Sequence, residues 1–136
     1  MSSRGLRNNN PGNIRQDKDK WLGEIKPSQD PDFKQFTSMA YGYRAMFKLL
    51  NNYQKLHGCR SLSDFINRWA PPSENNTTNY ISYVTRWSGV SDIETVNTQN
   101  HDKMVKIVTA MSRVENGRPA DPAEVEYGWQ LWRTNP

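Results

Sequence analysis

The sequence predicts a mostly α-helical domain that carries one small, irregular β-hairpin near its N-terminus. A length of 136 residues suits a single domain and leaves little for a second. The hydrophobic share is 35%, but five Trp, six Tyr and four Phe supply enough apolar area for a core. Apolar residues recur with helical spacing only after about residue 40. We therefore divide one domain, 1–136, into a loop and hairpin segment, 1–38, and a helical part, 40–133.

The first segment contains two turn signals. Asn10-Pro11-Gly12-Asn13 is typical of a turn, because Pro presets φ at the second position and Gly accepts a positive φ at the third. Asp30-Pro31-Asp32 is a second break, and short mixed runs flank it at 21–25 and 33–36. These two runs predict the strands of the hairpin.

Two helices are predicted in the first half of the helical part. One runs from about residue 41 to Gly58, and its apolar positions follow the i, i+3, i+4, i+7 rule: Met46, Leu49, Leu50 and Tyr53. The next begins after Ser61, where Asp64 is placed to complete a capping box, and it ends before Pro71-Pro72. We expect it to bury Leu62, Phe65, Ile66 and Trp69.

Three further helices follow. One is expected over 78–87 with Gly89 as its C-terminal cap, and it should bury Ile81 and Val84. The clearest helical pattern covers 100–115 and stops at Gly117; its apolar residues are Met104, Val105, Ile107, Val108, Met111 and Val114. The last helix opens with Asp121 as N-cap and Pro122 at its first position, and it carries Val125, Trp129 and Leu131 or Trp132.

Composition excludes several classes of protein. The single cysteine, Cys59, excludes an internal disulfide framework, and two isolated histidines exclude the familiar zinc spacings. No stretch reaches the roughly 18 apolar residues of a membrane span, and the first residues lack the apolar segment of a secretory signal. The net charge of +4 suits an anionic partner, either nucleic acid or bacterial cell wall.

Glu115 is the first candidate for chemistry. It continues the apolar stripe of Met104, Val108 and Met111. The four residues are spaced four, three and four apart, so they share one face of the helix, and this face must point to the core. Partial burial and the negative end of the helix dipole should both raise the pKa of its carboxyl group. A protonated carboxyl group is what a glycosidase needs to protonate a leaving oxygen. The alternative is a Glu that reaches water at a frayed helix end.

Two further blocks have the composition of a sugar-binding groove. In the stretch 68–77, Trp69 and Glu74 flank a rigid Pro-Pro corner, and Asn75 and Thr77 follow. Aromatic rings cover the faces of sugars, and amides and hydroxyls bond their polar groups. The same residues also fit an ordinary interhelix turn. The four Asn among residues 8–13, including Asn10 and Asn13, fit a structured loop or the polar wall of a cleft.

The block Gly5 to Arg15, GLRNNNPGNIR, resembles the opening of a family of phage and prophage proteins regarded as virion structural proteins. Later blocks match in the same order: Trp21-x-Gly23, Asp32-Phe33, Phe36, Gly42 to Ala45, Arg68 to Thr77 with Tyr80, and Glu115-Asn116-Gly117. The family pattern is similar to a lysozyme-superfamily α+β domain of the glucosaminidase or lytic transglycosylase type. In those enzymes the helix that ends in the catalytic Glu precedes an Asn-rich segment. Here the order is reversed, as a circular permutation would produce.

The resemblance implies roles for individual residues. Glu115 would be the general acid, with the loop 8–13 across the cleft from it. Glu74 and Asp32 match family positions that could supply a second carboxylate. The implied glycan-binding residues are Asn10, Asn13, Arg44, Trp69, Asn75, Thr77, Tyr80 and Asn116.

The leading hypothesis is therefore a phage enzyme, a muramidase, glucosaminidase or lytic transglycosylase, that cleaves the β-1,4 glycan backbone of peptidoglycan and needs neither a metal nor a cofactor. We expect synthesis in the host cytoplasm and then packaging in the virion or delivery to the cell wall. The alternative is a non-catalytic virion protein or wall-binding module. Nucleic-acid binding is disfavoured, because no helix carries a basic stripe and Trp69, Trp87 and Trp129 occupy expected core positions.

Overall fold

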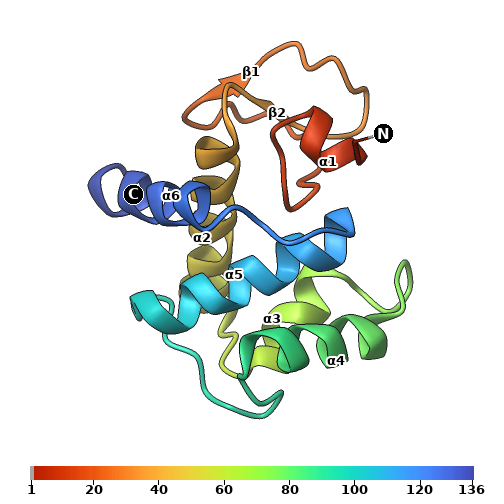
Figure 1. Cartoon of the computed structure of the whole chain (residues 1–136), viewed down its shortest axis with the longest axis vertical. Helices are drawn as coiled ribbons and strands as arrows, with labels where there is room; N and C mark the ends of the chain where they lie inside the picture. Colours follow the sequence, from red (N-terminus) through yellow and green to blue (C-terminus); the bar gives the residue numbers. More distant parts are fainter. Residues whose placement is uncertain (1) are drawn as a thin grey trace.

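The computed structural model describes residues 2–136 and is mostly helical, which confirms the predicted class. Its elements are α1 (Arg4–Arg7), β1 (Glu24–Ile25), β2 (Gln35–Phe36), α2 (Met39–His57), α3 (Leu62–Trp69), α4 (Thr77–Ser88), α5 (His101–Asn116) and α6 (Pro122–Thr134). In Figure 1, α2 runs along the molecule, α6 lies across it, and α4 and α5 lie beside one another. Within residues 2–136, no helix has the length and apolar character needed to cross a bilayer.

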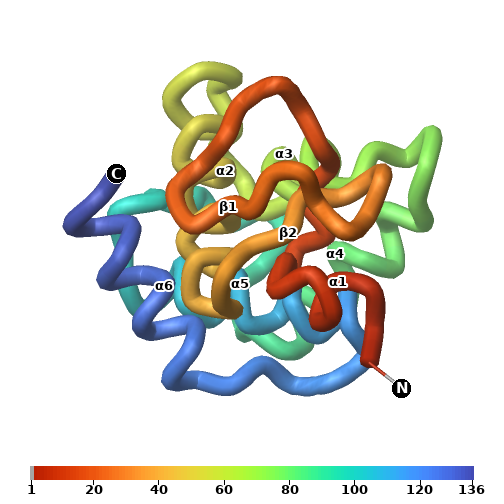
Figure 2. The backbone as a smooth tube through the Cα atoms, turned by 90° about the horizontal axis from the view of Figure 1, so that it is seen from above, coloured from red at the N-terminus to blue at the C-terminus, as the bar shows by residue number. Residues whose placement is uncertain are grey.

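The N-terminal segment contains the predicted hairpin. Strands β1 and β2 pair antiparallel, with Glu24 opposite Phe36. The sequence reading missed α1, because a single turn capped by the Ser3 hydroxyl is too short to show a helical period. Seen from above in Figure 2, this segment lies over the helical part, and the Ser3 hydroxyl donates to Asn116 Oδ1 of α5 at 2.7 Å.

The predicted turn at residues 10–13 needs a correction. The left-handed residues are Asn9, with φ 51°, and Asn13, with φ 49°, and Gly12 does not have a positive φ. Asn tolerates this conformation better than most residues. Gly12 is needed for space instead: a Cβ there would lie 2.7 Å from Trp69 Cζ2 and 3.0 Å from Met46 Cγ.

Local capping chemistry sets most helix ends where the sequence predicts them. The Ser61 hydroxyl accepts from the Asp64 backbone while the Asp64 carboxylate accepts from the Ser61 backbone, which is the predicted capping box. Helices α4 and α5 end at left-handed Gly89 and Gly117. Asp121 caps α6, with Pro122 at its first position.

The core lies between α2, α5 and α6, and it includes Tyr43, Phe47, Met104, Val108, Met111 and Trp132. The prediction that Trp87 is a core residue is wrong. Helix α4 packs through the face that carries Tyr80, Val84 and Ser88, which leaves Trp87 at the edge and 36% exposed. There it stacks on Tyr83, and the Arg113 guanidinium lies 4.2 Å from its ring centroid.

Candidate functional site

Glu115 lies in the last turn of α5, at the end of a buried stripe. Met104, Val108 and Met111 are at most 1% exposed, and the same helical spacing carries the next side chain into the protein. Asn116 follows, and left-handed Gly117 ends the helix. The stripe therefore places a carboxylate where an apolar residue would continue the core.

Three donors from three parts of the chain hold the Glu115 carboxylate. Asn13 Nδ2 donates to Oε1 at 3.0 Å, Tyr80 Oη donates to Oε2 at 2.8 Å, and Trp69 Nε1 lies 3.4 Å from Oε2. Burial raises the pKa of Glu115, and the bonds from Asn13, Tyr80 and Trp69 oppose this because they favour the charged form. The net pKa is raised, in the predicted direction.

The carboxylate opens into a groove of about 660 Å³, here called the Glu115 groove. The N-terminal segment contributes Arg4, residues 12–17, Trp21 and Phe33 to its walls. Helix α2 contributes Leu49 and Tyr53, and the end of α3 with the following loop contributes residues 68–71, Glu74 and Asn75. The structure thus brings together five of the residues singled out from sequence, namely Glu115, Asn13, Trp69, Glu74 and Asn75. Aromatic rings and polar groups alternate around the acid.

Tyr80 contacts Glu115 but does not line the groove. Its side chain is buried, and its hydroxyl group donates a hydrogen bond to the Glu115 carboxylate. Burial together with the Glu115 carboxylate raises the pKa of Tyr80 well above its ordinary value. Tyr80 therefore keeps its proton, and remains a hydrogen-bond donor, to higher pH than an ordinary tyrosine does.

Two of the predicted glycan-binding residues hold the loops around the groove and do not line it. Asn10 is fully buried, and its amide donates to the backbone carbonyls of Ile14 and Lys34. The Thr77 hydroxyl donates to the backbone carbonyl of Ala70. In both cases the polar side chain donates to a buried backbone carbonyl group, so that donor is not free to bind a ligand.

The other two residues outside the groove connect segments that are distant in sequence. Asn116 accepts from Ser3 and donates to the carbonyl of Pro11, which fastens the N-terminal segment to α5. Arg44 is buried in α2 and donates to the carbonyl of Asn135, far along the chain. Asp32, a family-matched candidate for a second carboxylate, pairs with Arg4 at 2.9 Å and is not a groove residue.

The groove also contains a carboxylate that the sequence analysis did not single out. Asp17 Oδ1 accepts from Lys34 Nζ at 2.7 Å, and Lys34 is fully buried between Asp17 and Glu24. Glu74, which lines the groove together with Asp17 and Glu115, is exposed. No signal marked Asp17, because a charged residue in a loop normally indicates only solvent exposure.

The arrangement fits acid catalysis on a sugar polymer. A carboxyl group with a raised pKa faces a polar and aromatic groove, and Asn13 and Asn75 can bond hydroxyl or amide groups. Within residues 2–136, no group of three His, Cys, Asp or Glu side chains is placed to hold a metal ion.

Comparison with known proteins places the chain. It is 35% identical over 133 residues to Protein P5 of Pseudoalteromonas phage PM2, an alignment that covers 95% of this chain and 81% of the phage protein. The chain belongs to the P5 family. No family model matches it. The predicted membership of a phage protein family is thus confirmed.

Proposed function

We propose that this P5-family chain cleaves the glycan strand of peptidoglycan, with Glu115 as the general acid. The observation that carries the proposal is the position of the Glu115 carboxyl group, which is half-buried, has a raised pKa and faces the groove. A raised pKa increases the fraction of the group that is protonated at a given pH, which favours proton donation to a glycosidic oxygen.

The proposed step balances without a cofactor. Glu115 gives its proton to the glycosidic oxygen, the C1–O bond breaks, and the leaving sugar departs as an alcohol. The C1 cation then takes the oxygen of a water molecule or of the muramic acid 6-hydroxyl, and that oxygen returns a proton to Glu115. The first route is the hydrolysis of a muramidase or glucosaminidase, and the second is the reaction of a lytic transglycosylase.

The groove walls support a sugar substrate. Trp69, Tyr53 and Trp21 offer ring faces, and Asn13 and Asn75 offer amides. Asp17 and Glu74 are the candidates for a second carboxylate, which would orient water or stabilise the cation. We also propose that the fold is a permuted lysozyme-like domain, because the Asn-rich loop and the Glu-ended helix meet although their order in the chain is reversed.

The test is the digestion of purified sacculi, followed by turbidity and by analysis of released sugars. The native chain should clear the suspension and Glu115→Gln should not. Glu124→Gln is the matched control, because Glu124 also has a pKa raised by burial but lies outside the groove, and it should clear normally. Reducing ends would indicate hydrolysis, and anhydro-sugars would indicate transglycosylation. Binding of sacculi by the native chain without any release of sugars would assign the groove to wall binding and overturn the catalytic proposal.

A further inference from the structure

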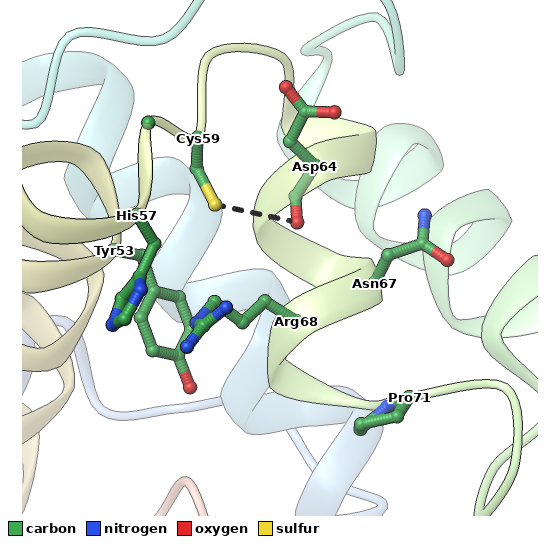
Figure 3. Close-up of a pocket in the computed structure, with 8 residues that line it drawn as sticks. Tyr53, His57, Cys59, Asp64, Asn67, Arg68 and Pro71 are labelled. Carbon is green, nitrogen blue, oxygen red and sulfur yellow. Dashed lines mark hydrogen bonds between the residues drawn. The ribbon is translucent and has the colours of Figure 1, made fainter.

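The Glu115 groove adjoins a second depression, here called the His57 hollow. It has a volume of about 840 Å³, and its walls come from the end of α2, with Tyr53 and His57, and from α3, with Asn67 and Arg68 (Figure 3). Tyr53, Arg68 and Pro71 line both depressions. The two are therefore neighbouring parts of one surface, and Arg68 lies at their junction.

A row of rings leads from the acid to this hollow. The Trp69 indole nitrogen lies 3.4 Å from Glu115 Oε2, and the ring centroids of Trp69 and Tyr53 are 6.3 Å apart at an angle of 67°. The centroids of Tyr53 and His57 are also 6.3 Å apart, at 70°. A ligand bound at Glu115 can thus continue along the rings into the His57 hollow.

Arg68 is exposed and has no carboxylate partner among residues 2–136. Its guanidinium lies 5.3 Å from the Tyr53 ring centroid. Figure 3 shows it beside the rings of Tyr53 and His57, while the Asp64 carboxylate points away at the other end of α3. That carboxylate caps α3 by accepting from the backbone of Ser61.

Arg15 repeats this arrangement in the N-terminal segment. It lines the Glu115 groove, its guanidinium lies 5.2 Å from the Phe33 ring centroid, and within residues 2–136 no carboxylate pairs with it. Arg4, on the same ring, is instead neutralised by Asp30 and Asp32. The groove thus presents two guanidinium groups that rest on aromatic rings and remain available for an anion.

We propose that Arg68 and Arg15 bind carboxylates carried by the glycan strand, and that Arg68 directs a carboxylate-bearing substituent into the His57 hollow. This inference rests on the proposed function and names its substrate class, an acidic glycan rather than a neutral one. Guanidinium groups pair with carboxylates through two parallel N–H donors, whereas a neutral polysaccharide offers no such partner. In peptidoglycan the carboxylate comes from the peptide stem, or from the lactyl ether of a muramic acid whose stem has been removed, because an attached stem converts the lactyl carboxyl group into an amide.

The test measures binding in the Glu115→Gln background, so that cleavage does not interfere. Arg68→Gln and Arg15→Gln are compared with Arg86→Gln. Arg86 is an exposed residue of α4 that lines neither depression, so this variant removes the same charge from a different place. The probes are intact sacculi, stem-free glycan strands that an amidase releases from them and that are immobilised on beads, and chitin, which has no carboxylate. The stem-free strands carry the lactyl carboxylates that the amidase exposes. Sedimentation at low and high salt gives the bound fraction.

We expect Arg68→Gln and Arg15→Gln to weaken binding to sacculi by about threefold to tenfold, and high salt to reduce the difference. A loss on the stem-free strands shows that the arginines bind a free lactyl carboxylate, and a loss confined to intact sacculi identifies the carboxylates of the stem. Binding to chitin should not change. An equal loss with Arg86→Gln, or on chitin, would overturn the inference. Failure of the proposed function is distinguishable from this, because the chain with Glu115 would then release no sugars although Arg-dependent binding persists.

Discussion

The hydroxyl of Tyr80 and the carboxylate of Glu115 are joined by a hydrogen bond of 2.8 Å between α4 and α5. Tyr80 approaches from the protein interior, and the groove lies on the other side of the acid. The bond fixes one carboxylate oxygen and favours its charged form, in opposition to burial. Tyr80 therefore positions Glu115 and tunes how readily it holds its proton.

The first prediction concerns Tyr80→Phe. Loss of this donor removes an interaction that lowers the pKa of Glu115, so the pKa rises further above its ordinary value. A general acid loses activity as the pH rises through its pKa, so the alkaline limb of the pH–rate profile should move to higher pH. Stability should fall by about 1 kcal/mol, as for one buried hydrogen bond. The measurement is the rate of sacculus digestion across pH.

Tyr43→Phe is the control for that experiment. Tyr43 is also buried, and its hydroxyl pairs with Ser112 Oγ at 2.9 Å, away from the groove. It should lose similar stability and keep the native pH–rate profile. An alkaline limb that stays in place in Tyr80→Phe, or that moves equally in Tyr43→Phe, would contradict the role given to Tyr80.

A second prediction follows from the close approach of Gly12 and Trp69. The backbone of Gly12 is acceptable to other residues, but an added Cβ would lie 2.7 Å from Trp69 Cζ2. In Gly12→Ala the indole must move, and its bond to Glu115 is lost. We expect a loss of stability of about 1–3 kcal/mol from overpacking and a fall in the cleavage rate of about tenfold or more.

The comparison variant is Gly89→Ala. Its Cβ meets nothing within 4 Å, but its φ of 75° makes Ala unfavourable there, so stability falls without any change at the groove. Thermal unfolding and sacculus digestion are measured on both variants. If Gly12→Ala digests sacculi as fast as Gly89→Ala, the indole of Trp69 does not contribute to the site.

These residues show which features can be predicted from sequence. The capping box of Ser61 and Asp64 and the inward position of Glu115 depend on neighbours within about three helical turns, so local pattern is sufficient. The groove walls are different, because Asp17, Tyr53 and Arg68 meet only through tertiary packing. Pattern also cannot separate a polar residue that bonds buried backbone, such as Asn10, from one that faces a ligand.

A third prediction concerns His101, at the start of α5. Its Nε2 lies 2.7 Å from Glu126 Oε1 of α6, and its Nδ1 lies 2.7 Å from Asp102 Oδ1. The bonds to these two carboxylates raise the pKa of His101 above 6.5 in the folded state. The native state thus binds this proton more tightly than the unfolded chain does. The stabilisation is complete below the unfolded value and is lost as the pH rises through the folded pKa.

The effect should be small, below about 1 kcal/mol, because the His101 and Glu126 side chains are close to half exposed to solvent and Asp102 is 87% exposed. Urea unfolding from about pH 5 to about pH 9 measures it in the native chain and in His101→Gln. The variant should lack this part of the pH dependence. Identical slopes for the two proteins would show that the ring does not hold α5 to α6 through its charge.

The last prediction is that Glu115 also makes stability depend on pH. The cause is burial of its carboxyl group, whereas for His101 it is the bonds to two carboxylates. Because burial raises its pKa, the native state keeps this proton over a range above 4.5 in which the unfolded chain has released it. The free energy of unfolding then falls as the pH rises through that range, by at most about 1.4 kcal/mol per pH unit for one proton. Glu115→Gln has no proton to release there, so its unfolding free energy should lack this fall. Glu124, whose pKa burial also raises, should contribute a separate fall, so Glu124→Gln should lose that part and keep the part due to Glu115. If the native chain and Glu115→Gln show the same slope above pH 4.5, the carboxylate is not buried at an energetic cost, and its suitability as a proton donor would lose its physical basis.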